Sequence, residues 1–332
     1  MSGHDVLVLG GAGVDTTVYV PELPLPYRDT YQVPPVTDRI GNTGAGVALG
    51  CHALGLGVAF ADLIGDDPQG ALIRHALRDV DCRWGTAVAG TRRSVLLVGP
   101  DGRRTSFYDA KATPGELMPR QLYADVRPRH VHLSIMDFCR HLIPEFDGVP
   151  LSTDLHDWDG AAGYQKDFAY GCDLVFLSAA ALSDPIAVMR DIIARGRAHT
   201  VVCTRGADGC LVLTREAETR EAETREAESR AGKACAGEGG TRAGEGETHP
   251  REGGTRVGEV RAFPAAPLPG PVADSNGAGD AFVSGFLYGS LRGEPLERCV
   301  RLGAIAGAHA CTVTGTHESP ITEPLLLARA AG

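Results

Sequence analysis

Short apolar runs that end in glycine-rich or polar loops recur along most of this 332-residue chain. The four clearest runs lie within residues 6–9, 58–61, 173–178 and 200–203. Apolar runs without polar alternation are typical of parallel strands that are buried on both faces of a sheet. Segments with helical spacing of apolar residues separate these runs. The sequence therefore predicts an α/β fold, a doubly wound, mainly parallel sheet with helices on both faces, in one domain over residues 1–332.

Four loops that follow predicted strands contain small and acidic residues suited to binding a ligand. They span residues 13–15, 41–46, 204–209 and 274–280. In open α/β sheets, ligands bind at the carboxyl ends of the strands. We therefore expect these four loops to form a single site.

The stretch 273–282 reads Ala-Asp-Ser-Asn-Gly-Ala-Gly-Asp-Ala-Phe and leads into apolar residues at helical spacing. Gly277, Ala278 and Gly279 should therefore lie where a loop becomes a helix. Small residues let backbone N–H groups approach a ligand, and the first N–H groups of a helix favour an anion such as phosphate. Asp280 would lie beside that anion, where a carboxylate could accept the proton of an attacking hydroxyl group. The alternative is structural, because Asp is also favoured in a first helical turn.

The same stretch resembles the C-terminal signature of the ribokinase-like (PfkB) carbohydrate kinases, which is usually written D-T-x-G-A-G-D-x-F. The resemblance implies that Asp280 is the catalytic base and that the backbone of residues 277–279 forms an anion hole. It also implies a monovalent-cation site near Asp274. An ATP-dependent kinase that transfers the γ-phosphate to a hydroxyl group of a sugar or related carbohydrate is the function we expect, with ATP and Mg²⁺, and with K⁺ as a further candidate.

Two N-terminal segments are similar to the substrate-binding segments of that family. After residues 10–13 the chain is β-branched and strand-like, which does not fit a dinucleotide-binding turn; the family binds substrate hydroxyls with an Asp here, and Asp15 takes that position. Residues 41–55 resemble the segment G-G-x-x-x-N-x-A-x-x-x-x-x-L-G, which implies that Gly41, Asn42 and Gly46 face the substrate. Asn42 replaces the second Gly and Gly46 replaces the Asn, so the identity of the sugar is open. We expect a loop over residues 41–46 and a helix over residues 47–54.

Residues 93–98 and 103–108 flank Gly-Pro-Asp-Gly, which predicts a β-hairpin. The resemblance implies that strands from about 15–40 and 91–110 form a small β-sheet lid over the substrate.

The segment Thr-Arg-Gly-Ala-Asp-Gly at residues 204–209 is similar to the family's nucleotide loop, T-x-G-x-x-G. This implies that Thr204, Gly206 and Gly209 bind the nucleotide together with Gly279. The family has N-x-x-E after the strand that precedes this loop, where it helps to hold the magnesium nucleotide. This chain has Ser178-Ala-Ala-Ala181 instead, which weakens the prediction of a protein-bound metal.

Composition limits the partners and the location that we expect. The net charge of −10 argues against non-specific nucleic-acid binding, and no apolar run is long enough for a membrane span or signal peptide. The nine Cys are scattered without a C-x-x-C pair, which argues against disulfides and structural zinc. We expect a cytoplasmic enzyme with a small-molecule, sugar-like substrate, and a homodimer is a further hypothesis.

Residues 215–257 depart from the strand and helix pattern. Arg-Glu-Ala-Glu-Thr repeats with a period of five, which matches neither a helix nor a strand, and a mixture of Gly, Glu and Arg follows. We expect a low-complexity, disordered insertion between two hairpin strands, residues 211–213 and 258–263. A partner-binding arm is the alternative.

Three other functions remain open at this point. A nucleoside kinase would share the fold. A degenerate member could bind a ligand without turnover, since N-x-x-E is absent. A metal-dependent hydrolase could use the acids and imidazoles of residues 154–159.

Overall fold

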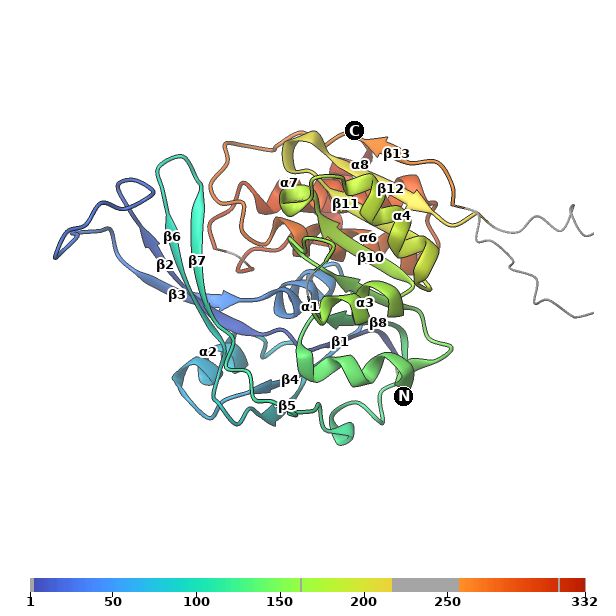
Figure 1. Ribbon diagram of the computed structural model, residues 1–332, viewed down its shortest axis with the longest axis horizontal. Coiled ribbons are helices and arrows are strands. Elements are labelled where there is room, and N and C mark those ends of the chain that lie inside the picture. The colour runs from blue at the N-terminus through green and yellow to red at the C-terminus, as the bar shows by residue number, and fades with distance from the viewer. Residues whose placement is uncertain (1–2, 162, 217–256, 316, 332) are drawn as a thin grey trace, which may run out of the picture.

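A nine-stranded sheet forms the centre of the protein in the computed structural model, which describes residues 3–161, 163–216, 257–315 and 317–331 (Figure 1). The strand order is β13-β12-β11-β10-β9-β8-β1-β4-β5. The strands from β11 to β5 are parallel, and β12 and β13 are added antiparallel at one edge. These strands are β1 (His4–Leu9), β4 (Val58–Ile64), β5 (Asp81–Thr86), β8 (Pro128–Ser134), β9 (Leu151–Asp154), β10 (Leu174–Ser178), β11 (Thr200–Thr204), β12 (Cys210–Thr214) and β13 (Arg261–Phe263).

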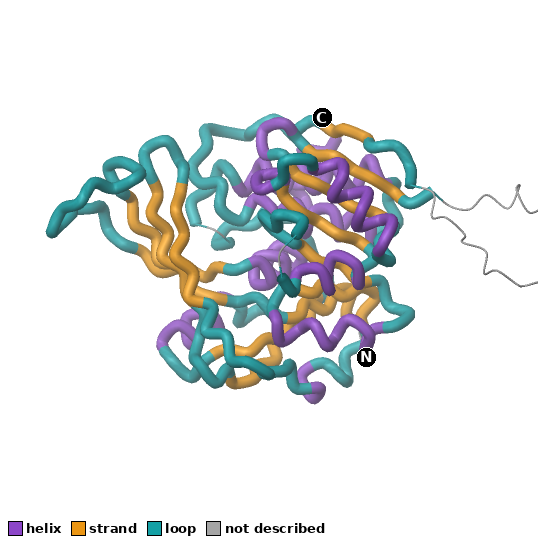
Figure 2. Tube along the Cα trace, viewed as in Figure 1, coloured by secondary structure: helices purple, strands orange, loops and turns teal. Residues whose placement is uncertain are grey.

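Helices cover both faces of this sheet (Figure 2). One face packs on α1 (Thr43–Ala53), α2 (Pro68–Ala76), α6 (Ala278–Leu291), α7 (Leu296–Ala310) and α8 (Glu323–Ala331). The other packs on η2 (Asp137–Phe146), α3 (Gln165–Gly171) and α4 (Pro185–Arg195). Short 3₁₀ turns are η1 (Arg120–Leu122), η3 (Ala179–Ala181) and η4 (Gly206–Asp208).

Strand β1 shows why the apolar runs do not alternate. Val6 and Val8 belong to the hydrophobic core on one face of the sheet, and Leu7 and Leu9 belong to the core on the other. All four side chains are fully buried. The predicted α/β fold with a mainly parallel sheet is thus confirmed.

The order of the strands around β1 indicates at which edge of the sheet a ligand can bind. From β1 the chain continues to β4 and β5 on one side, and it later returns to β8, β9, β10 and β11 on the other. Loops that leave neighbouring strands in opposite directions open a crevice at their carboxyl ends. Gly10 and Gly11 follow β1 at this edge, and both have positive φ angles, of 79° and 87°.

A separate four-stranded sheet, the lid, projects from one side of the body (Figure 1). Its order is β3-β2-β6-β7, and β2 and β6 are its one parallel pair among the described strands. The strands are β2 (Gly13–Tyr19), β3 (Thr37–Gly41), β6 (Arg93–Val98) and β7 (Arg104–Asp109). The hairpin predicted around residues 99–102 is confirmed as β6 and β7. That this sheet covers the substrate remains a prediction.

Helix α1 begins earlier than the sequence predicted. It starts at Thr43 rather than at residue 47, so Gly44, Ala45 and Gly46 form its first turn. A Cβ atom at Gly44 would lie 1.8 Å from the carbonyl oxygen of Gly10, and the N–H group of Ala45 donates to the Gly11 carbonyl at 2.9 Å. Close packing against the loop after β1 thus outweighs the low helix propensity of glycine.

The predicted hairpin around the low-complexity segment is confirmed, because β12 pairs antiparallel with β13 and Arg215 forms a bridge with Val257. Residues 217–256, which contain nearly all of the predicted insertion, lie outside the described residues. In the described ranges, no helix has both the length and the apolar character needed to cross a membrane.

Candidate active site

The N-terminus of α6 lies at the centre of the candidate site. Gly277 precedes the helix with a φ angle of 77°, a left-handed conformation that glycine adopts at little cost. In the described part of the chain, no side chain caps this helix. Among these first groups, the N–H of Ala278 makes one long contact, with the Ser275 carbonyl oxygen at 3.4 Å. The N-terminus of α6 can therefore bind an anion at the positive end of the helix dipole.

Asp280 is in the first turn of α6, as predicted, and its side chain is buried. Burial raises the pKa of this carboxyl group well above its ordinary value, and the nearby negative charges of Asp154 and Asp15 raise it further. Arg104 acts in the opposite direction. A carboxylate with a raised pKa is a stronger proton acceptor than an exposed one.

Asp15 in β2 lies against Gly41 at the end of β3. A Cβ atom at Gly41 would be 2.3 Å from the Asp15 Cγ atom, so this position has no room for a larger residue. Asn276 Nδ2 donates to Asp15 Oδ2 at 3.3 Å, and Ser94 also hydrogen-bonds with the carboxylate. Burial raises the Asp15 pKa in spite of these contacts.

The other two substrate-segment residues lie nearby. Asn42 has a φ angle of 72°, and its side chain hydrogen-bonds with Tyr108 of β7. Gly46 packs against the base candidate itself, because a Cβ atom there would be 2.8 Å from Asp280 Oδ2. The structure thus brings the predicted substrate residues together with Asp280, although it does not test their roles.

Polar contacts join the lid to the body around this site. Arg104 at the start of β7 donates to Asn276 Oδ1, next to the anion loop. At the other edge of the lid, Arg39 of β3 forms an ion pair with Glu318 at 3.5 Å. Sequence reasoning missed Arg104 and Arg39, because neither lies in a motif.

One row of side chains crosses the lid on the face of Asp15. Direct strand pairing places Arg39, Asp15, Ser94 and Tyr108 side by side in β3, β2, β6 and β7. Directly paired residues point to the same face of a sheet. This face therefore presents charged groups, a hydroxyl group and an aromatic ring towards the site, which is a chemistry suited to sugar hydroxyls and sugar rings.

The predicted nucleotide loop lies at the same edge of the sheet. Thr204 ends β11 and pairs in register with Ser178, which ends β10. Gly206 and Gly209 have φ angles of 58° and 78°, and a Cβ atom at Gly209 would be 2.0 Å from the Phe263 carbonyl oxygen. Gly209 is therefore needed so that the chain can pass close to the end of β13. At Gly206 a Cβ atom would have no neighbour within 4 Å.

The residues that replace N-x-x-E offer little to a metal ion. Ser178 Oγ accepts a hydrogen bond from the Ala180 N–H group at 3.2 Å, and no carboxylate follows within this turn. Asp274 is also engaged locally, since its Oδ1 accepts from the Asn276 N–H group at 2.9 Å.

The hydrolase hypothesis finds no support in residues 154–159. His156 Nε2 lies 3.1 Å from Thr43 Oγ1, and Asp154 Oδ1 accepts from the His156 N–H group. Among the described residues, no three His, Cys, Asp or Glu side chains form a group that could hold a metal ion.

Comparison with known proteins identifies the family. The model of the pfkB family carbohydrate kinases matches residues 248–323. Acarbose 7(IV)-phosphotransferase of Actinoplanes sp. (strain ATCC 31044 / CBS 674.73 / SE50/110) is 46% identical over 339 residues, which cover 100% of both chains. This chain belongs to the pfkB family of carbohydrate kinases. It is an ATP-dependent kinase that transfers the γ-phosphate to a hydroxyl group of a sugar, as the signature at residues 274–282 predicted.

Solved structures support the assignment. The structure of a microbiome-derived acarbose kinase matches with a TM-score of 0.82 at 40% identity, over 100% of both chains. A ribokinase of Arabidopsis thaliana, complexed with ribose and ATP, matches with a TM-score of 0.73 over 100% of both chains. At 18% identity this second likeness concerns the fold alone.

Proposed function

We propose that this kinase phosphorylates acarbose or a closely related sugar, with Asp280 as the catalytic base. The observation on which this depends is the full-length likeness to two acarbose-phosphorylating proteins, at 46% and 40% identity. The row Arg39, Asp15, Ser94 and Tyr108 supports it, because this row offers both polar partners and an aromatic surface to a sugar.

In the proposed mechanism Asp280 accepts the proton of the substrate hydroxyl group as its oxygen attacks the γ-phosphate. The N–H groups of residues 277–279 stabilise the negative charge on the transferred group. Asp15, Gly41, Asn42 and Gly46 position the sugar. The loop with Thr204, Gly206 and Gly209 binds the nucleotide together with Gly279.

We expect Mg²⁺ and K⁺ to be bound by different groups. Ser178 and Ala181 supply no carboxylate, so we propose that Mg²⁺ is held mainly by the ATP phosphates and water, and we derive no step through a protein-bound metal. Asp274, whose carboxylate accepts a hydrogen bond from the Asn276 N–H group, is our candidate ligand for K⁺.

We further propose how the enzyme assembles and where in the cell it works. Val95 and Phe107 pair across β6 and β7 on the lid face away from Asp15, and both are exposed. This apolar pair supports a homodimer formed through the lid, which light scattering would test. Because ATP is its cosubstrate, we propose that the enzyme works in the cytoplasm.

A coupled ADP-release assay with one panel of acceptors tests the substrate proposal. The panel contains acarbose, maltotriose, ribose, fructose, adenosine and cytidine. We expect acarbose to give the highest kcat/KM. Higher activity with a nucleoside or a monosaccharide would contradict the proposed substrate, and no ADP release with any acceptor would favour a ligand-binding protein without turnover.

A further inference from the structure

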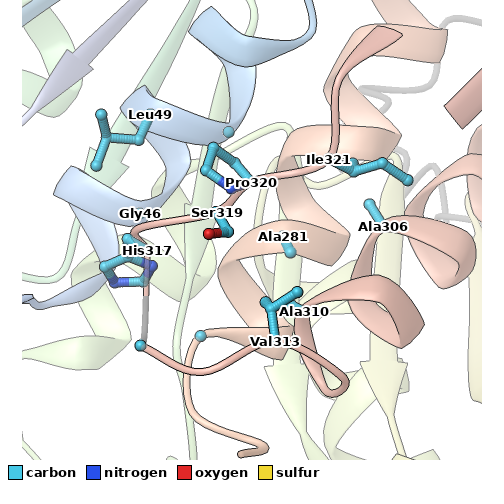
Figure 3. A pocket seen from close by; sticks show the side chains of 13 residues that line it. Gly46, Leu49, Ala281, Ala306, Ala310, Val313, His317, Ser319, Pro320 and Ile321 are labelled. Carbon is cyan, nitrogen blue, oxygen red and sulfur yellow. The ribbon is translucent and has the colours of Figure 1, made fainter. Parts of the chain in front are cut away.

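His317 follows α7 in the loop that leads to Pro320 and faces the base candidate. Its side chain is buried, with 8% of the residue exposed, and its Nε2 atom lies 3.5 Å from Asp280 Oδ2. Figure 3 shows the imidazole ring beside Gly46 of α1, at the wall of a pocket that α6, α7 and Ser319 also line. A histidine thus contacts the carboxylate from the side of the body.

Gly46 is what leaves room for this imidazole ring. A Cβ atom at position 46 would lie 2.4 Å from His317 Cε1 and 2.8 Å from Asp280 Cβ. No side chain at position 46 fits without moving one of these two groups. The glycine and the histidine therefore form two halves of one local arrangement.

The charged groups around Asp280 include more carboxylates than cations, so a cation at the position of His317 would stabilise the ionised form of Asp280. From β9 and β2 it faces two further carboxylates, Asp154 and Asp15, and from β7 it faces Arg104. From α1 it faces the uncharged Gly46. Beyond His317, the Arg39–Glu318 ion pair carries no net charge.

Arg104 is the weakest of these influences on Asp280, so a base that must be ionised beside two carboxylates is helped by a second positive charge. A cation within about 4–6 Å of a carboxylate stabilises its charged form. A protonated His317 meets this distance. Its Nε2–H group would engage Oδ2 and leave Oδ1 to accept the substrate's proton.

We propose that His317 is a positioning residue for phosphoryl transfer, which orients the Asp280 carboxylate and keeps it ionised, and that Gly46 is needed to admit its imidazole ring. The proton on His317 stays on Nε2 throughout, and the proton of the substrate hydroxyl group goes to Asp280. The proposal rests on the proposed role of Asp280 as the base.

The dependence of kcat on pH distinguishes this role from simple packing. In His317→Gln the acid limb, where Asp280 becomes protonated, should move to higher pH by about one unit or more, because the cation is lost. The KM for the sugar and the ATP affinity should stay near their wild-type values, because His317 contacts the base rather than either ligand. An acid limb that coincides with the wild-type limb would overturn the proposal.

Gly46→Ala provides an independent variant. The added Cβ should displace the imidazole ring and shift the acid limb in the same direction. In the double variant the two shifts should not add, because both remove the same contact. Additive shifts would mean that Gly46 and His317 act separately, which contradicts the pairing.

His309→Gln is the matched control. His309 Nε2 lies 3.2 Å from the Ser319 carbonyl oxygen, so it contacts the same loop without reaching Asp280. Its acid limb should match that of wild type. An equal shift in this control would assign the effect to the loop and overturn the role of His317.

Asp280→Asn separates the failure of this inference from failure of the proposed function. High turnover in Asp280→Asn would refute the assignment of Asp280 as the base. If Asp280→Asn is inactive and the acid limb of the kcat–pH profile of His317→Gln coincides with that of wild type, only the role of His317 is refuted. If neither His317→Gln nor Gly46→Ala folds, proton NMR of the His317 ring decides. Its titration midpoint should be lower in Asp280→Asn than in wild type, and an unchanged midpoint would contradict the contact.

Discussion

The body and the lid are held together by different kinds of contact. The strands of the body are buried on both faces, and its helices pack on two continuous hydrophobic cores. In the lid, β7 is exposed along its whole length. The contacts from β7 and β3 to the far side of the site are polar, through Arg104 with Asn276 and Arg39 with Glu318.

This difference assigns separate tasks to the two regions. Apolar packing fixes a geometry well, and the body holds Asp280 and the anion loop at the start of α6. A few solvent-accessible polar contacts break at a lower cost, so we expect the lid to open for a sugar and to close over it. We therefore expect changes in the body to lower kcat and changes in the lid to raise the KM for the sugar.

The largest effect is expected for Asp280→Asn in the body. The substitution keeps the size of the side chain and removes the proton acceptor, so kcat should fall by ~10²–10⁴-fold. ATP affinity, measured by calorimetry, should be retained, because the nucleotide contacts come from backbone. Asp274→Asn is the control and should change the K⁺ dependence more than kcat. Loss of ATP binding along with turnover would show that Asp280 is structural.

The same variant has a pH-dependent effect on stability. Burial and neighbouring carboxylates raise the pKa of Asp280, so the folded protein binds this proton more tightly than the unfolded chain. Stability from the protonated form is lost as the pH rises through the raised pKa. Asp280→Asn removes this titration, so wild type should lose melting temperature relative to the variant as the pH rises through the raised pKa. A difference in melting temperature that does not change with pH would contradict this.

In the lid, Asp15→Asn should act on substrate binding. The loss of a charged acceptor for sugar hydroxyls is expected to raise the KM for acarbose by ~10–100-fold, the equivalent of about 1.5–3 kcal/mol for a hydrogen bond to a charged group. The ATP affinity should change little. Initial rates over a range of acarbose concentrations check this, and a fall in kcat at constant KM would place Asp15 in the chemical step.

Arg104→Met should loosen the contact between lid and body. It removes the donor to Asn276 while keeping a long side chain, so kcat/KM for the sugar should fall about tenfold. Arg103→Met is the matched control on the same hairpin, because Arg103 pairs with Asp101 within the turn. Equal losses in both variants would refute a specific role for Arg104.

A smaller effect is expected for the double variant Ser178→Asn with Ala181→Glu at the end of β10. It restores the N-x-x-E pattern, so the magnesium concentration for half-saturation should fall by a few-fold. Titration of free Mg²⁺ at saturating ATP measures it. No change would mean that other groups hold the metal or that this segment does not correspond to the family pattern.

The smallest effect is expected when residues 217–256 are replaced by a short Gly-Ser turn. Arg215 and Val257 already pair as neighbours, so a few residues can join them, and the cost of loop closure depends weakly on length. kcat and the yield of soluble protein should stay near wild type. A large fall in kcat would show that this segment contributes to the site.

The sequence by itself determined that buried strands alternate with helices, and it determined the position of the anion loop. These features depend on local patterns: continuous apolar runs for buried strands, helical spacing after Asp280, and glycine at the left-handed position 277. The family signature is just as local, so it placed Asp280 in the first turn of α6 without knowledge of the fold.

The tertiary structure decided which distant residues meet. The pairs His317 with Asp280, Gly46 with His317 and Arg104 with Asn276 join separate elements that share no periodic signal. The replacement of Asn by Gly46 was visible in the sequence, but the imidazole ring that fills the space was not. Even the start of α1 was set by packing on Gly10, because close contacts between distant segments outweigh the small energies of local propensity.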